Sequence, residues 1–214
     1  MPSHLAPHLV GVDFSSAPTH RKPITVARGV LHGARVSLQR VDALPTLSAF
    51  EALLREPGPW LGAFDFPFGL PRELVASLGW PRTWRALMRH YAALTRPQIR
   101  DTFAAFCAAR PAGAKFAHRA CDAPAGSSPS MKWVNPPVAY MLHAGAPRLL
   151  DAGLHLPALS DGDMTRIALE GYPGLLTIRC DRPIIKDEPN RYRHGSPKCF
   201  YISKKQKLAR DGLC

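Results

Sequence analysis

Acidic residues are scarce in this sequence. Its 214 residues include 16 Asp and Glu against 28 Lys and Arg, which leaves a formal net charge of +12 at pH 7. Half of that excess lies in residues 179–214, where ten basic residues stand against four acidic ones. A strong positive balance favours an anionic partner, so the sequence leaves open either a solvated basic surface or a face that binds nucleic acid.

Three other features are missing. The five cysteines include no Cys-x-x-Cys pair, and no secretory signal peptide precedes the first apolar segment. No apolar run approaches the length needed to cross a membrane. We therefore expect a cytoplasmic protein with free thiols and no membrane association.

Three apolar segments end at a carboxylate, and they are the main functional signal. The segments lead to Asp13, Asp65 and Glu170. Short apolar runs bounded by breakers are typical of strands buried on both faces of a sheet. Each acid alone has a simpler explanation as a turn or surface residue. Their recurrence at strand ends favours one joint site.

The order of elements predicts an α/β fold. Residues 22–31 and 35–41 have the pattern of an antiparallel hairpin. Ser48 and Glu51 form a capping-box pattern for a helix that ends before the Asp65 strand. A crossover helix favours a parallel strand, so Asp13 and Asp65 would emerge side by side if their strands are neighbours.

The remaining segments predict one domain over residues 1–214 with a helical insertion at about 72–150. Within the insertion, residues 112–137 are a Gly-, Ser- and Pro-rich loop, and a long loop of this kind is often functional. Residues 138–150 are expected to form a helix broken at Gly145 or Pro147.

Converging carboxylates repel one another unless a cation lies between them. Oxygen-only ligation by Asp13, Asp65 and Glu170 suits Mg²⁺ or Mn²⁺, and such ions activate water for phosphodiester cleavage. The candidates for holding phosphates or substrate are Ser15, Arg119, Asp122, Lys132 and Lys186. For two of them a structural role competes: Ser15 can end its strand, and Asp122 can pair with Arg119.

Five motifs appear in the chain in one order: Gly11-Val-Asp13-Phe-Ser-Ser, Phe64-Asp65-Phe-Pro-Phe-Gly-Leu-Pro71, His118-Arg119-Ala-Cys-Asp122, Lys132-Trp-Val-Asn135-Pro-Pro and Glu170-Gly-Tyr-Pro173. Together they resemble the family called domain of unknown function 429, described as predicted nucleases on a ribonuclease H-like fold.

The resemblance covers about residues 9–173. It implies a mixed central sheet with a leading hairpin, parallel strands and an inserted helical region, and it implies a lysine after the glutamate, for which Lys186 is the match here. It also implies a further C-terminal helix carrying another acid. We expect this helix to be shortened, because only Asp211 lies in that direction.

These patterns predict a metal-dependent nuclease or related phosphodiester hydrolase that acts on DNA or RNA. The first alternative is a nucleic-acid-binding module without turnover. The second is a nucleotide-binding protein of the actin or sugar-kinase type, suggested by the turn after Asp13. That reading lacks support elsewhere, because the sequence contains no Gly-x-Gly or Walker-type phosphate loop.

Overall fold

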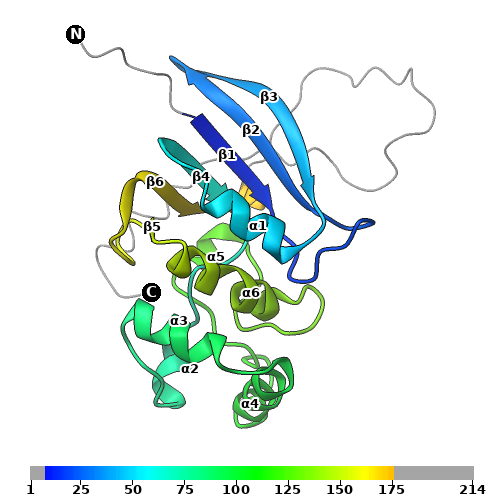
Figure 1. The fold of residues 1–214 in the computed structure, drawn as a ribbon. Coiled ribbons are helices and arrows are strands. Elements are labelled where there is room, and N and C mark those ends of the chain that lie inside the picture. The colour runs from blue at the N-terminus through cyan, green and yellow to red at the C-terminus, as the bar shows by residue number, and fades with distance from the viewer. Residues whose placement is uncertain (1–7, 176–214) are drawn as a thin grey trace, which may run out of the picture.

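A mixed β-sheet forms the upper half of the molecule in Figure 1, and most of the helices lie below it. The computed structural model describes residues 8–175, and in this part six strands lie in the order β3-β2-β1-β4-β6-β5. The strands are β1 (His8–Asp13), β2 (Ile24–His32), β3 (Arg35–Leu44), β4 (Trp60–Phe64), β5 (Leu154–His155) and β6 (Asp163–Glu170). The predicted α/β class is confirmed.

The predicted hairpin is present as β2 and β3, which pair antiparallel. Gly33 in the turn has φ of +59°, a conformation that glycine adopts without steric cost. The inner face of β2 is buried through Ile24 and Val26, whereas Val36 and Leu38 of the edge strand β3 are exposed. The sequence pattern therefore located both strands, but only β2 places its apolar residues in the core.

The sheet becomes parallel beyond β1. Strand β4 pairs parallel to β1 on one side and to β6 on the other. Helix α1 (Leu47–Leu54) makes the crossover to β4, as expected. Its predicted start was wrong by two residues: Thr46 caps the helix, because its hydroxyl accepts the Ala49 N–H at 3.1 Å, and Ser48 lies inside.

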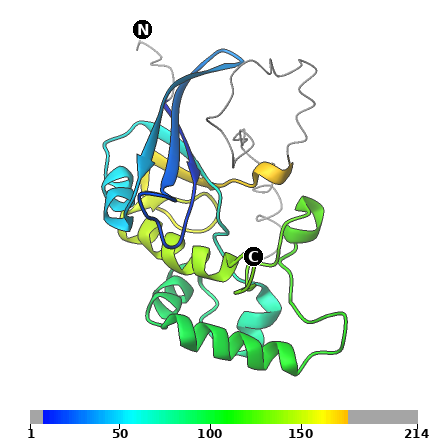
Figure 2. The same cartoon turned by 90° about the vertical axis from the view of Figure 1, so that its right-hand side faces the viewer.

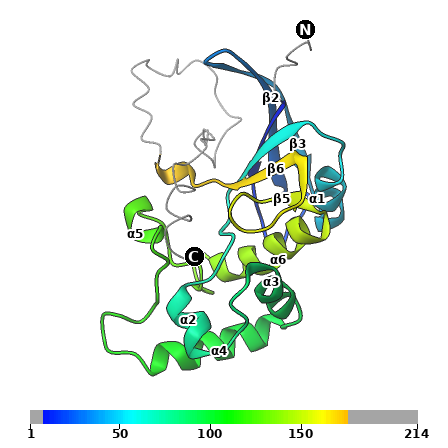
Figure 3. The same ribbon diagram turned by 90° about the vertical axis from the view of Figure 1, so that its left-hand side faces the viewer.

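The described helices of the insertion are α2 (Arg72–Ser77), α3 (Trp84–Ala92), α4 (Arg96–Ala108), α5 (Asp122–Ala125) and α6 (Val138–Asp151). Helices α2, α3 and α4 lie beyond α6, on the side away from the hairpin, as Figures 1 and 2 show. Helix α5 lies close to the 3₁₀ turn η1 (Pro173–Leu175) in Figures 2 and 3, and the Tyr172 hydroxyl donates to the Gly126 carbonyl at 3.2 Å. The insertion loop therefore returns to the end of β6.

Helix α6 is continuous, so the predicted break at Gly145 or Pro147 was wrong. A proline inside a helix costs about 3 kcal/mol, but residues 144–147 are all buried and their packing offsets that cost. A Cβ on Gly145 would lie 2.6 Å from the Phe66 ring. The glycine therefore permits a close approach between α6 and the chain that follows β4.

Aromatic rings fill the core where the sheet meets α1 and α6. The rings of Phe14, Phe50, Phe64, Phe66 and Phe68 form a chain of contacts with centroid separations of 4.6–6.3 Å. Three of these rings come from the segment Phe64–Phe68, which surrounds Asp65. The core therefore fixes the backbone on both sides of that acid.

Several expectations concern other parts of the chain. Lys186 and the shortened C-terminal helix with Asp211 lie outside the described residues. Between residues 8 and 175, no helix combines the length and apolar character that a membrane span requires.

Candidate functional site

The carboxyl ends of β1 and β4 bring two of the predicted acids to one edge of the sheet. The parallel register pairs Val12 with Phe64, so Asp13 and Asp65 follow at the same level. The Asp65 N–H donates to the Val12 carbonyl at 2.9 Å, which extends the ladder to Asp65 itself. Neighbouring strands lie roughly 4.8 Å apart, so the two carboxylates start from adjacent backbone positions.

Glu170 ends the next parallel strand, β6, at the same edge. Its register partner is Phe64, one residue before Asp65. Successive residues of a strand point to opposite faces, so Glu170 starts on the face of Phe64 and Asp13 starts on the other face. The three acids share an edge of the sheet, but the pleat separates Glu170 from Asp13.

The Glu170 carboxylate is bound by Arg119 of the insertion loop. Arg119 Nη1 donates to Oε2 and Nη2 donates to Oε1, both at 2.8 Å, in a forked pair. The backbone N–H of Phe68 also donates to Oε2, at 3.0 Å. Charge-assisted, two-pronged pairs of this kind are strong and geometrically specific.

Arg119 also binds Asp122, so the cluster has three members. Arg119 Nε and Nη2 donate to Asp122 Oδ1 at 3.0 and 2.8 Å, and the Arg119 backbone N–H donates to Oδ2 at 2.8 Å. The side chain of Asp122 is fully buried and that of Arg119 is 4% exposed. We call Arg119, Asp122 and Glu170 the buried triad.

Electrostatics keep the Arg119 side chain charged. Burial by itself lowers the pKa of Arg119, but the carboxylates of Glu170 and Asp122 raise this pKa above its ordinary value. The guanidinium therefore stays protonated, and one cation faces two carboxylates. This arrangement confirms the structural alternative for Asp122, namely a salt bridge with Arg119.

The other predicted residues are placed as follows. Ser15 directly follows β1, and its hydroxyl accepts the Ala17 N–H at 3.4 Å. Lys132 lies in the insertion loop, where its N–H donates to the Pro129 carbonyl at 3.0 Å and its carbonyl accepts the Ala139 N–H at 2.9 Å. These contacts do not test phosphate binding by Ser15 or Lys132, so their binding roles stay predictions.

The three acids are not equally well placed to bind a divalent cation. Within residues 8–175, no group of three or more His, Cys, Asp or Glu side chains is arranged to hold a metal ion. Mg²⁺ often binds through one or two carboxylates and keeps several waters, so Asp13 and Asp65 suit it as a pair. Glu170 could join them only by sharing its oxygens with Arg119 or by losing that contact.

The contact between Arg119 and Glu170 had no signal in the sequence. The two residues are 51 positions apart in the sequence. Asp122 is only three positions from Arg119 and is a sufficient ion-pair partner for it, so the sequence does not call for a second acid. The hydrogen bond from the Phe68 N–H to Glu170 also could not be predicted. Every residue except proline has a backbone N–H, so the sequence does not indicate which one binds a given carboxylate. The Arg119 contact arises from the return of the insertion loop to β6, whereas the Phe68 contact arises from the turn that follows β4.

Comparison with known proteins adds no further constraint: no protein-family model, no curated protein and no solved structure matches this chain. The interpretation of the site therefore depends on its own geometry.

Proposed function

We propose that this protein is a metal-dependent nuclease or a related phosphodiester hydrolase. The observation that carries the proposal is the placement of Asp13, Asp65 and Glu170 at the carboxyl ends of three adjacent parallel strands. Ligands in open α/β sheets commonly bind at this edge. The net charge of +12 supports a polyanionic substrate.

The proposal includes a ribonuclease H-like sheet and membership of the domain of unknown function 429 family. The strand order supports it, because an antiparallel hairpin leads into parallel strands and a helical region is inserted between β4 and β6. We also propose a cytoplasmic location, which the free thiols of Cys107 and Cys121 support.

In this proposal Asp13 and Asp65 hold a Mg²⁺ or Mn²⁺ ion, and Glu170 is the third candidate ligand. When bound, such an ion polarises a phosphoryl oxygen and makes a water molecule a better nucleophile. The chain itself supplies the positioning. Arg119 fixes Glu170, while Ser15 and Lys132 are the candidates for orienting phosphate oxygens.

A cleavage assay tests the proposal. The substrates are single-stranded and duplex DNA, RNA and a small phosphodiester, each with Mg²⁺ or Mn²⁺. We expect Asp13→Asn and Asp65→Asn to lower the rate by about 100-fold or more, because each removes a charged ligand while preserving shape. The thermal midpoint should remain close to that of the wild type.

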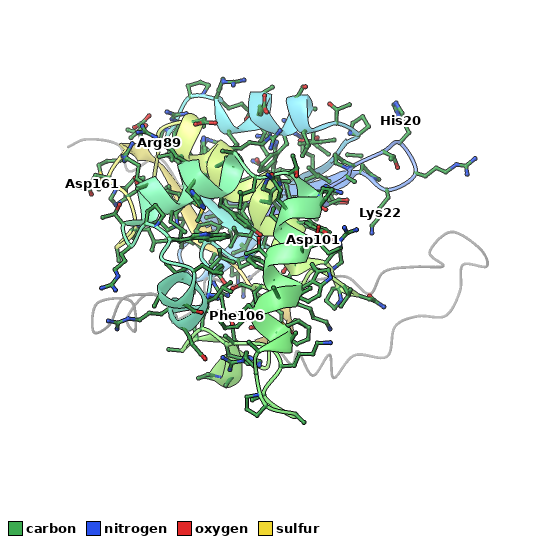
Figure 4. All side chains as sticks on the ribbon, turned by 90° about the horizontal axis from the view of Figure 1, so that it is seen from below. His20, Lys22, Arg89, Asp101, Phe106 and Asp161 are labelled. Atoms are coloured by element: carbon green, nitrogen blue, oxygen red, sulfur yellow. The ribbon has the colours of Figure 1, made fainter. Side chains whose placement is uncertain are left out.

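The matched control is Asp101→Asn, which removes an exposed acid on α4 (Figure 4). It should leave the rate unchanged. Equal activity in all three variants would assign the cleavage to a contaminant, and no cleavage of any substrate by the wild type would contradict the proposal.

The buried triad favours a second candidate, a nucleic-acid-binding module without turnover. In the described structure both Glu170 oxygens are engaged by Arg119, which supplies the positive charge that a cation would otherwise supply. This candidate predicts salt-sensitive binding of nucleic acid and no cleavage with any divalent ion. The same assay, with binding measured in parallel, separates the two.

A further inference from the structure

Two aromatic rings come together from opposite arms of the insertion loop. The rings of Phe116 and Trp133 have centroids 5.6 Å apart and an interplanar angle of 64°. Both side chains are half-buried and pack against the core. The Ala117 N–H donates to the Met131 sulfur at 3.3 Å, so the two arms are joined by residues close to the rings in the chain. We call Phe116 and Trp133 the aromatic platform.

Two lysines lie close to the rings of the platform. Lys115 Nζ lies 5.9 Å from the Phe116 ring centroid, and Lys132 is the chain neighbour of Trp133. The only acid in residues 112–137 is Asp122, which is fully buried and bound to Arg119. Outside the buried triad, the charged residues of the loop are the exposed Lys115 and the half-buried Lys132, and both are positive.

The buried triad connects the platform to the acids of the sheet edge. Phe116 precedes Arg119 by three residues, a distance of at most about 11 Å along the backbone. The guanidinium of Arg119 contacts Glu170 at the end of β6. Arg119 therefore links the segment that carries Phe116 to the end of β6, which is one of the three strands of the proposed catalytic edge.

We propose that the aromatic platform binds single-stranded nucleic acid by stacking unpaired bases on Phe116 and Trp133, with Lys115 and Lys132 contacting the phosphates. Aromatic side chains interleaved with lysines are typical of single-strand binding, because every base has a face that can stack. In a duplex those faces are covered by neighbouring bases. The inference rests on the proposed function and narrows its substrate to single strands.

Binding is measured by fluorescence anisotropy with labelled single strands of DNA and RNA and with a duplex of equal length. Each strand is longer than roughly 16 nucleotides, the largest site size of known single-strand-binding domains. EDTA is present, so the result does not depend on cleavage. We expect the wild type to prefer single strands, and Trp133→Leu and Phe116→Leu each to weaken that binding by about tenfold. Leucine keeps apolar packing but removes the ring.

The control is Trp80→Leu. Trp80 is a half-buried ring that precedes α3 and contacts the rings of His90 and Tyr91, with centroid separations of 4.8 and 6.1 Å, so it resembles Trp133 in burial and in having ring neighbours. This variant should bind like the wild type. Thermal midpoints of all three variants show whether any loss of affinity reflects unfolding.

The lysines are tested by salt dependence. Lys115→Ala should lower the slope of log affinity against log salt concentration by about 0.7, the value for one phosphate contact to a single strand. Arg89→Ala removes a charge from the exposed end of α3 and should leave the slope unchanged.

The outcomes separate this inference from the proposed function. Single-strand binding that depends on the platform, without cleavage in Mg²⁺ or Mn²⁺, would support the inference and contradict the hydrolase. Cleavage with equal affinity for duplex, or with no effect of the two leucine variants, would support the hydrolase and overturn the inference. Failure to bind any nucleic acid at low salt would also overturn it.

Discussion

Two ion clusters occupy different ends of the same sheet and differ mainly in burial. Near the start of β4, Arg28 makes a forked pair with Glu56 at 2.6 Å and a third contact with Asp42 at 2.7 Å. These carboxylates are 42% and 29% exposed, and the cluster borders a cavity of about 440 Å³. The buried triad at the other end has almost no exposure at Arg119 and Asp122.

Because the two clusters differ in burial, they should contribute differently to the free energy of unfolding. An exposed ion pair contributes up to about 1 kcal/mol, because water solvates and screens its charges. A buried ion pair gains more from Coulomb attraction but loses the hydration of each ion, so its net contribution is small while the loss of one partner is costly. The main role of the buried triad is therefore to fix the position of the insertion loop at the end of β6.

The largest expected effect comes from removing the cation of the buried triad. Arg119→Gln leaves the carboxylates of Asp122 and Glu170 without their shared partner. We expect the free energy of unfolding to fall by about 3–5 kcal/mol, the usual cost of breaking a buried pair. Urea denaturation at neutral pH measures this change.

Arg28→Gln is the matched control, because it removes a forked arginine from the more exposed cluster. Its expected cost is about 1 kcal/mol. Adding Asp122→Asn to Arg119→Gln removes one stranded charge and should restore part of the lost stability. Equal losses for Arg119→Gln and Arg28→Gln would refute the role assigned to burial.

A smaller effect is expected from pH at the start of β6. Hydrogen bonds from Thr165 and Arg166 lower the pKa of Asp163 from 3.8 to about 2. Because the folded-state pKa is depressed, ionised Asp163 stabilises the fold above pH 4, and this contribution is lost as the pH falls toward 2. Asp163→Asn should therefore make the fall in thermal midpoint between pH 4 and pH 2 shallower. An unchanged slope would show that this carboxylate has no such role.

Local patterns predicted the fold well where short-range chemistry decides the structure. The hairpin turn at Gly33 and the apolar strand before Asp65 both follow from neighbouring residues. Prediction failed where tertiary contacts decide. Pro147 stays helical because its surroundings are buried. The cap at Thr46 rather than Ser48 is a local error of two residues, since both residue types suit that position.

The same division applies to the site. Asp13 and Asp65 could be placed side by side from strand order, because the carboxyl ends of neighbouring parallel strands share an edge. The register of Glu170 and its contact with Arg119 could not be predicted, since they depend on how the pleat and a long insertion meet in space.

The most direct test of the central claim is a crystal structure of the protein soaked in Mn²⁺, with anomalous density examined around the three acids. The account predicts Mn²⁺ bound to carboxylate oxygens of Asp13 and Asp65. A well-ordered sheet edge with no Mn²⁺ at either aspartate, at a concentration that supports cleavage, would contradict it.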